Sequence, residues 1–321
     1  MPHVLVAGKI HESGLAVLKA APGFSCDVVD EVSAASYLPL LPKADAVLIR
    51  TQPMPASAIA SAPNLRIVSR HGVGYDAVDV AALNARKIPL CIVGDVNSRA
   101  VAEHTLMLML AAARRVVAHD QAVRANNWNL RNAFDAIELD GKRLLVLGFG
   151  RIGRRVAELA RAFGMEVAAI DPNVAANDFA AAHVEAAGTL HEALRVADYV
   201  SLHVPMIAGK ALLGSPELAL LKPSAIVINA ARGGLIDEAA LDAALRSRKL
   251  RAAGLDVLAE EPPAPDHPLL SNPFVTISPH NAGLTSECAA RMAVAAANNI
   301  LDFFAGRLDQ RLVVNAAAIN G

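Results

Sequence analysis

Residues 144–153 read LLVLGFGRIG, a short hydrophobic run followed at once by three glycines spaced G-x-G-x-x-G. The run predicts a buried strand, and the next residues, 154–162, predict a helix. In that context Gly148 allows a tight turn, Gly150 lets the backbone approach a pyrophosphate, and Gly153 lets the helix pack closely on the strand. Free N–H groups and the dipole at a helix N-terminus favour the charge of phosphates. We therefore predict a Rossmann-type dinucleotide site here rather than an ordinary turn.

The choice of dinucleotide follows from the next predicted strand. Residues 167–170 are apolar and lead into Asp171, 18 residues after Gly153. A carboxylate at this point accepts hydrogen bonds from the adenosine ribose hydroxyls and repels a 2′-phosphate. The segment 171–175 reads DPNVA and contains no Arg or Lys. NAD is therefore favoured over NADP, although Asp171 followed by Pro172 also fits a plain turn at a strand end.

Short β-branched runs alternate with alanine-rich helical stretches along the chain. The runs before the glycine motif cover 4–7, 46–49, 65–68 and 90–93, and those from the motif onward cover 144–147, 167–170, 199–203, 225–229, 252–257 and 275–278. This alternation predicts the α/β class, with two doubly wound parallel sheets of about five and six strands. Between the two series we expect a long helix over about 101–125 and, over 126–131, a polar surface arm or connector.

The domain organisation depends on the last predicted helix, roughly 285–304. It comes too late for the second sheet and is expected to cross back to the first unit, which makes the first domain discontinuous. We predict one domain over 1–98 and 287–321 and a dinucleotide-binding domain over 99–286. A chain of 321 residues with 54% hydrophobic residues can form two such cores.

Composition argues against several partners and locations. The net charge of −1 gives no reason to expect nucleic acid or an anionic membrane as a partner. Cys26, Cys91 and Cys288 are odd in number and far apart, so we expect no disulfide framework, no metal site and a reduced, cytoplasmic setting. The first twelve residues do not resemble a secretory signal, and the most apolar stretch, 105–113, is too short to span a bilayer.

Three polar side chains, Arg232, Glu261 and His280, each follow the end of a predicted strand of the second series. Ligands bind at the carboxyl ends of strands in open parallel sheets. Taken singly, each residue fits an ordinary loop position. Together they offer a fork of donors for a carboxylate and a pair that can move a proton.

Seven stretches make the sequence similar to the D-isomer-specific 2-hydroxyacid dehydrogenase family. They are RHGVGYD at 70–76, VAEHT at 101–105, GFGRIG at 148–153, HVP at 203–205, NAARGGLIDE at 229–238, GLDVLAEEP at 254–262 and PH at 279–280. They occur in the family's order and span nearly the whole chain. The resemblance implies a Rossmann domain that binds NAD, a flavodoxin-like substrate domain, and hydride transfer to or from C2 of a small D-2-hydroxy or 2-oxo acid.

The resemblance also implies a catalytic trio. His280 would deliver the proton to the carbonyl oxygen, since histidine titrates near neutral pH. Glu261 would orient His280 and stabilise its charged form. Arg232 would hold the substrate carboxylate and polarise the adjacent carbonyl. Backbone N–H groups around Val73 and Gly74 would hold the same carboxylate.

Further cofactor contacts follow from the same resemblance. Arg151 and Ile152 would lie at the pyrophosphate, Val204 and Pro205 beside the adenine ribose, Ala230 and Asp256 near the nicotinamide, and Gly283 with His280 at that end. The Asp256 carboxylate would contact the carboxamide. Alternatively, Asp256 is a buried partner for a helix N-terminus.

The substrate is not fixed by the sequence. Arg50, Arg70 and His71 lie near the ends of first-domain strands and could favour a polar or anionic group at C3, as in hydroxypyruvate or 3-phosphoglycerate; glyoxylate is a further candidate. Surface ion pairs are the alternative, particularly for Arg70. Tyr75 departs from the small residue or asparagine common in the family.

Assembly and rival functions are the remaining expectations. The apolar segment 101–131 predicts a homodimer, or else a helix buried within its own subunit. The chain ends at Gly321, so control by serine through a C-terminal regulatory domain is not expected. A non-catalytic NAD(H)-sensing corepressor is one alternative, which the near absence of tails disfavours. A formate or phosphite dehydrogenase is another; formate dehydrogenases of this type resemble the family but have Gln where Glu261 stands.

Overall fold

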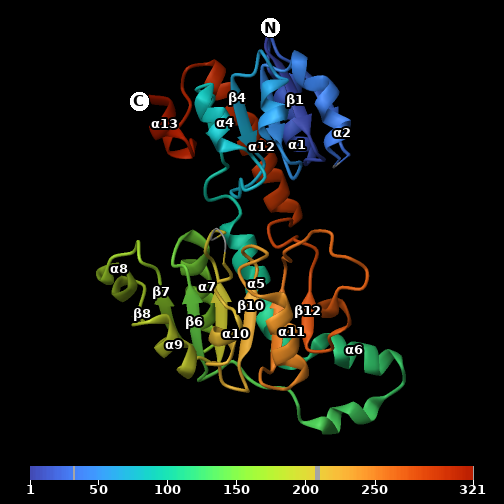
Figure 1. Cartoon of the computed structure of the whole chain (residues 1–321), viewed down its shortest axis with the longest axis vertical. Helices are drawn as coiled ribbons and strands as arrows, with labels where there is room; N and C mark the ends of the chain where they lie inside the picture. The colour runs from blue at the N-terminus through green and yellow to red at the C-terminus, as the bar shows by residue number, and fades with distance from the viewer. Residues whose placement is uncertain (32, 207–209, 321) are drawn as a thin grey trace. The chain divides into compact units, whose positions relative to one another are not determined.

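The computed structural model describes residues 1–31, 33–206 and 210–320. Contacts divide the chain into two compact units, Met1–Asn97 with Leu284–Gly321, and Ser98–Gly283 (Figure 1). Each unit contains a parallel β-sheet with helices packed against it. The predicted fold class of two parallel-sheet α/β domains is therefore confirmed.

The first unit has a five-stranded sheet in the order β2-β1-β3-β4-β5. Its strands are β1 (His3–Ala7), β2 (Ser25–Val29), β3 (Ala46–Ile49), β4 (Ile67–Arg70) and β5 (Leu90–Cys91). Its helices are α1 (Glu12–Ala20), α2 (Ala34–Tyr37), η1 (Leu38–Lys43), α3 (Ala56–Ala60), α4 (Val80–Ala85), α12 (Ser286–Phe304), η4 (Gln310–Leu312) and α13 (Ala316–Asn320).

The C-terminal segment belongs to this first unit because α12 packs against α1 and β4. A Cβ at Gly14 of α1 would lie only 2.7 Å from the Cβ of Ala293, so the two helices approach as closely as a glycine allows. Beyond α12, the buried Asn315 accepts a hydrogen bond from the Leu90 N–H through its Oδ1 at 2.8 Å. The end of the chain is thereby fixed beside β5.

The second unit has a seven-stranded sheet in the order β12-β11-β10-β9-β6-β7-β8. Its strands are β6 (Arg143–Leu147), β7 (Glu166–Ile170), β8 (Glu185–Ala186), β9 (Tyr199–Leu202), β10 (Ile226–Asn229), β11 (Ala252–Leu255) and β12 (Val275–Ile277). Its helices are α5 (Ser98–Arg114), α6 (Val116–Arg124), η2 (Trp128–Ala133), α7 (Arg151–Ala162), α8 (Ala176–Ala181), α9 (Leu190–Val196), α10 (Ser215–Leu218), α11 (Glu238–Arg246) and η3 (Pro268–Ser271).

Both faces of this second sheet are covered, as the central strand β6 shows. Leu144 and Val146 pack in a cluster with residues of α5 and α7. Leu145 and Leu147 point to the other face and pack with residues of α9, α10 and α11. The strand order reverses beside β6, so the topological switch point lies between β6 and β9, where open α/β sheets bind ligands.

Two details of the second unit differ from the sequence prediction. The sheet has seven strands rather than about six, because the two exposed residues of β8 add an edge strand. The long helix predicted over 101–125 is broken, since α5 ends at Arg114 and α6 begins at Val116. Between them Arg115 has a left-handed φ of 50°, and its guanidinium pairs with Asp135. In Figure 1 α6 and η2 project from the second unit as an arm.

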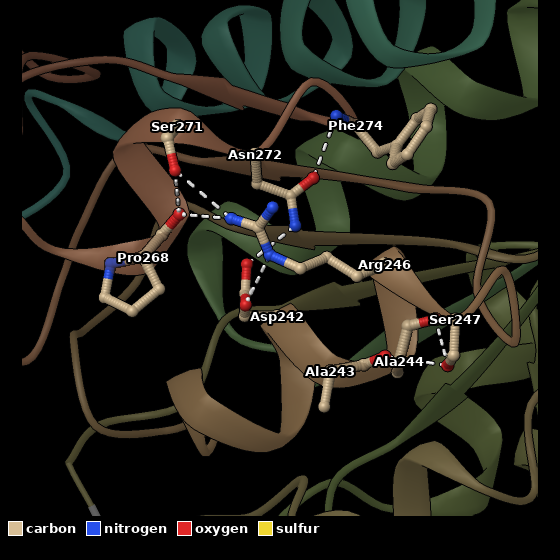
Figure 2. A network of polar contacts seen from close by, with 9 residues as sticks. All are labelled: Asp242, Ala243, Ala244, Arg246, Ser247, Pro268, Ser271, Asn272 and Phe274. Atoms are coloured by element: carbon tan, nitrogen blue, oxygen red, sulfur yellow. Dashed lines mark hydrogen bonds and ion pairs between the residues drawn. The ribbon is translucent and has the colours of Figure 1, made fainter.

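A polar network fixes the approach to β12 (Figure 2). Arg246, at the end of α11, donates to the Pro268 carbonyl at 3.1 Å and to Ser271 Oγ at 3.2 Å. Asp242 accepts from Arg246 and from the side-chain amide of Asn272, each at 2.8 Å. The turn before β12 is thus tied to α11, which fixes where that strand begins.

Candidate active site

The glycine loop after β6 shows a separate steric reason for each glycine. Gly148 has a φ of 94°, and a Cβ there would lie 2.5 Å from the His203 carbonyl oxygen. At Gly153 a Cβ would lie 2.1 Å from the Gly148 carbonyl oxygen, so α7 packs directly on the loop. No described atom lies within 4 Å of a Cβ at Gly150, which caps α7. The loop therefore packs tightly on the protein at Gly148 and Gly153 and leaves space at Gly150, beside the N-terminus of α7. A pyrophosphate needs this space to reach the helix N–H groups.

Asp171 follows β7 and is bound to this loop. Its carboxylate accepts the Phe149 N–H at 2.9 Å through Oδ2 and the Asn173 N–H at 2.9 Å through Oδ1. Each oxygen keeps acceptor capacity for a hydroxyl group. Asp171 therefore both orders the glycine loop and presents a carboxylate beside it.

Arg154 is a neighbouring cation that the sequence reasoning missed. Its guanidinium lies 4.7 Å from the centre of the Phe149 ring and 3.4 Å from Asp178 Oδ2. It lies one turn into α7, whereas the sequence argument about a 2′-phosphate considered only the residues that follow Asp171.

The remaining predicted cofactor residues belong to the loops around this point. Ala230, after β10, packs with Val101 and Ala282, and Ile152 packs against the same cluster. Arg151, the first residue of α7, is exposed, as is Pro205. Val204 follows β9, with its Cγ1 2.9 Å from the position of a Cβ at Gly148. Gly283 is the last residue of the second unit.

His280 and Glu261 form a direct pair in the second unit. The His280 Nδ1 lies 2.6 Å from Glu261 Oε2, and Glu261 Oε1 accepts the Leu258 N–H at 3.1 Å. Burial opposes ionisation of Glu261, but the hydrogen bond and charge of His280 outweigh it and hold the pKa of the carboxyl below its ordinary value. The pair can therefore hold an ionised carboxylate against an imidazole.

Arg232 is held by a turn that depends on Asn229, a residue the sequence reasoning did not single out. Asn229 is buried; its Oδ1 accepts the Ala231 N–H at 3.0 Å and its Nδ2 donates to the Arg232 carbonyl at 2.8 Å. Asparagine directly after a strand is a common turn former, and that signal could have identified it. A Cβ at Gly233 would lie 1.8 Å from the Leu258 carbonyl oxygen, so this turn packs on the backbone that leads to Glu261.

Asp256 organises the chain around His280. Its side chain is fully buried and accepts the Ser278 hydroxyl at 2.6 Å, the Asn281 N–H at 3.0 Å and the Ala282 N–H at 2.9 Å. Burial alone would raise its pKa, but these bonds and His104 hold the pKa below the ordinary value. The donors come from a loop, so the alternative of a helix N-terminus as the partner of Asp256 is wrong.

The predicted substrate residues Arg50, Val73 and Gly74 belong to the first unit. Arg50 follows β3, donates to the Lys9 carbonyl at 2.8 Å and has its pKa lowered by burial. Arg70 is paired with Ile49 in the register of β3 and β4, so the two guanidinium groups come from neighbouring strand ends. His71 is buried, and burial together with Arg50 and Arg70 lowers its pKa to about 4.

Within residues 1–31, 33–206 and 210–320, no helix has the length and apolar character needed to cross a membrane. The same part of the chain contains no cluster of three or more His, Cys, Asp or Glu side chains arranged to hold a metal ion.

Comparisons with known proteins bear on this geometry. A family model described as D-isomer specific 2-hydroxyacid dehydrogenase, NAD binding domain, matches residues 106–282. The chain is 40% identical over 310 residues to D-3-phosphoglycerate dehydrogenase of Mycobacterium leprae, covering 95% of this chain but 57% of that protein. It therefore spans little more than half the length of that relative.

Two further relatives match over nearly their full length. Glyoxylate reductase of Aeropyrum pernix is 37% identical over 326 residues, which cover 97% of this chain and 96% of that protein. The crystal structure of an NADPH-dependent glyoxylate/hydroxypyruvate reductase from Sinorhizobium meliloti in complex with citrate superposes with a TM-score of 0.82, at 29% identity, over 95% of each chain.

Proposed function

This chain belongs to the D-isomer-specific 2-hydroxyacid dehydrogenase family, and on that basis we propose that it transfers a hydride between NAD(H) and C2 of a small D-2-hydroxy or 2-oxo acid. The predicted family and the predicted NAD cofactor are confirmed by the match over 106–282 to an NAD-binding domain of this family. The observation that supports catalysis most strongly is the 2.6 Å contact between His280 Nδ1 and Glu261 Oε2.

In this proposal NAD(H), when bound, supplies or accepts the hydride, and a side chain of the protein donates or accepts the proton. Because Glu261 holds Nδ1 of His280, the other ring nitrogen, Nε2, exchanges the proton with the substrate oxygen. Glu261 stabilises the imidazolium that exists before reduction or after oxidation. Arg232 binds the substrate carboxylate through its planar fork of donors.

We assign the cofactor to the domain predicted over 99–286 and the substrate to the domain predicted over 1–98 and 287–321. Within the first unit, backbone N–H groups at Val73 and Gly74 would bind a carboxylate of the substrate. The glycine loop, Asp171, Val204, Pro205, Ala230, Asp256 and Gly283 would contact the cofactor. Asp256 retains acceptor capacity on Oδ2 for a carboxamide, beyond its bond from Ala282.

The substrate candidates are 3-phosphoglycerate, glycerate or hydroxypyruvate, and glyoxylate. Arg50 supports an anionic or polar group at C3, because it is half-buried and donates to a neutral carbonyl at 2.8 Å. The test is NADH oxidation with glyoxylate, hydroxypyruvate and 3-phosphohydroxypyruvate. If the protein oxidises NADH with none of these three acids, the proposed reaction is contradicted.

We also propose a homodimer formed through the segment 101–131. A depression of about 450 Å³ lies on this part of the second unit, lined by Glu103, Leu106, Met107, Leu110, Ala111, Val116, Leu159 and Phe163. Met107, Val116 and Phe163 are 43%, 51% and 45% exposed, which is high for apolar side chains grouped together. A monomeric mass at micromolar concentration would contradict the dimer.

The alternative from another class is a non-catalytic NAD(H) sensor that acts as a corepressor. It would bind NADH and a protein partner without oxidising NADH in the presence of 2-oxo acids. A cytoplasmic location remains part of the proposal and rests on the three free thiols.

A further inference from the structure

His104 on α5 makes contacts that the proposed mechanism does not use. Its Nε2 lies 2.8 Å from Ser278 Oγ and 3.4 Å from Asp256 Oδ1. The side chain is only 15% exposed, and the Asp256 side chain beneath it is fully buried. A largely buried histidine therefore contacts the carboxylate that organises the His280 loop.

The packing of α5 on β11 explains this placement. A Cβ at Gly254 of β11 would lie 2.9 Å from the Cβ of Leu108, so the helix lies as close to the strand as a glycine permits. His104 is four residues before Leu108 and shares its face of the helix. Asp256 is two residues after Gly254 and continues on the same side of the strand. The close contact at Gly254 thus positions His104 over Asp256.

The hydrogen bonds converge on Asp256, from His104 through Ser278 on one side and from the loop N–H groups on the other. The Ser278 hydroxyl donates to Asp256 Oδ1 at 2.6 Å, so the Ser278 oxygen accepts from Nε2–H of His104 at 2.8 Å. Asp256 in turn accepts the N–H groups of Asn281 and Ala282. His104 therefore acts on both sides of His280 through Ser278 and Asp256.

The residue at the centre of this network has an unfavourable backbone conformation. His280 has a left-handed φ of 52°, and its N–H donates to the Asp256 carbonyl at 2.8 Å. A non-glycine residue keeps such a conformation only when its surroundings enforce it. The bonds around Asp256 enforce it, and they also set the direction in which the imidazole points toward Glu261.

We propose that His104 is a positioning residue for His280: through Ser278 and Asp256 it holds the loop that directs the imidazole at Glu261 and at the substrate oxygen. This inference rests on the proposed dehydrogenase function. The contacts of His104 are with Ser278 and Asp256. The proposed pyrophosphate and ribose contacts of NADH lie elsewhere, so loss of His104 should reduce turnover more than the affinity for NADH.

The test compares three variants of the whole 321-residue chain. His104→Leu keeps the side-chain bulk and removes the donor, His104→Gln keeps a donor at similar reach, and His191→Leu removes an exposed His–carboxylate contact elsewhere in the same unit. We expect His104→Leu to lower kcat between about 10- and 100-fold, as small misplacements of catalytic groups do, with the dissociation constant of NADH changed less than about threefold. His104→Gln should recover most of kcat, and His191→Leu should match the wild type.

A second readout does not depend on turnover. Amide hydrogen exchange at Asn281 and Ala282 should become at least about tenfold faster in His104→Leu, and not in His191→Leu. Ser278→Ala should have the same effects, and the double variant should be no worse than either single variant, because both act on one chain of bonds.

The outcomes separate the two proposals. Wild-type kcat and unchanged amide exchange in His104→Leu would overturn the positioning role. A parallel loss of kcat, NADH affinity and melting temperature, without rescue by His104→Gln, would also overturn it, in favour of a purely structural role. A wild-type chain that binds NADH but reduces no 2-oxo acid would contradict the proposed function, while the exchange data would still decide whether His104 orders the loop.

Discussion

The carbonyl oxygen of Leu258 lies 1.8 Å from the position that a Cβ at Gly233 would occupy. This approach joins the turn that carries Arg232 to the backbone that carries Glu261. Gly233→Ala should force the two segments apart and lower kcat/KM for the 2-oxo acid by at least about tenfold, with a stability loss of about 1–3 kcal/mol from overpacking. Steady-state kinetics with urea unfolding would check this, and Gly188→Ala, where the nearest atom is a Glu192 side-chain oxygen at 3.3 Å, is the milder control.

Gly150 and Gly153 should respond differently to the same substitution. Gly150→Ala meets no described atom within 4 Å, so stability should stay within about 0.5 kcal/mol while NADH affinity falls, because the methyl group occupies the approach of the pyrophosphate. Gly153→Ala meets the Gly148 carbonyl at 2.1 Å and should destabilise the fold itself. Melting curves and fluorescence titration with NADH separate the two effects; equal stability losses would contradict the assignment.

Asp171 should make the chain prefer NADH. We expect at least about a tenfold preference over NADPH, since a phosphate beside a carboxylate should cost more than ~1.4 kcal/mol. Asp171→Ala should reduce the preference for NADH over NADPH, mainly by weakening NADH binding. The variant loses both the ribose contact and the hydrogen bond from the Phe149 N–H. Equal kcat/KM for both cofactors in the wild type would contradict the role assigned to Asp171.

Variants of the proposed catalytic residues His280 and Arg232 should have distinguishable kinetic defects. His280→Gln should reduce turnover by about 10²–10⁴-fold, as expected for loss of a general acid, with NADH binding nearly unchanged. Arg232→Ala should weaken binding of the 2-oxo acid as well as turnover, because it removes the carboxylate contact. Kinetics across substrate concentration would show this split. Wild-type turnover in His280→Gln would invalidate the mechanism and leave the fold assignment intact.

His71 should make the first unit sensitive to acid. Burial, Arg50 and Arg70 lower its pKa from 6.5 to about 4 in the folded chain. The unfolded chain therefore binds a proton first, and stability is lost as the pH falls from about 6.5 toward 4. The full effect is on the order of 3 kcal/mol.

The check is urea unfolding at pH 7.5 and pH 5. His71→Asn cannot titrate and should lose less stability between these two conditions than the wild type. His191→Asn, whose side chain is 59% exposed in the wild type, should behave like the wild type. If the stability of His71→Asn depends on pH in the same way as that of the wild type, the role assigned to His71 is contradicted.

The sequence predicted the structure most accurately where a single local requirement determines the backbone conformation. The glycine motif and the strand–helix alternation each have a short-range cause, and the fold class follows from them. The strand β8 was missed because two exposed residues carry no hydrophobic pattern. The break at Arg115 was missed because nothing local forbids a continuous helix there; the contact with Asp135 is made by a residue 20 positions away.

The individual residues of the candidate site could be predicted from the sequence. The residues that hold them in place could not. Arg232, Glu261 and His280 could be selected by type and position at strand ends. Asn229, His104 and Ser278 act through bonds that join separate elements, and the sequence does not show which of many polar residues will meet. Asp256 was expected to face a ligand, whereas most of its acceptor capacity is used within the protein.

The break at Arg115 has a consequence for how this chain can vary. Asp135 pairs with Arg115 and His119 and, through its carbonyl, with Arg251, so both ends of the arm are fastened to the body of the second unit. A segment closed in this way can be lengthened at small entropic cost, because closure entropy grows only with the logarithm of length. Insertions between residues 125 and 128 are therefore expected to change what the arm contacts while leaving the candidate active site unaltered. The arm is thus a segment in which the proposed assembly could change independently of the proposed activity.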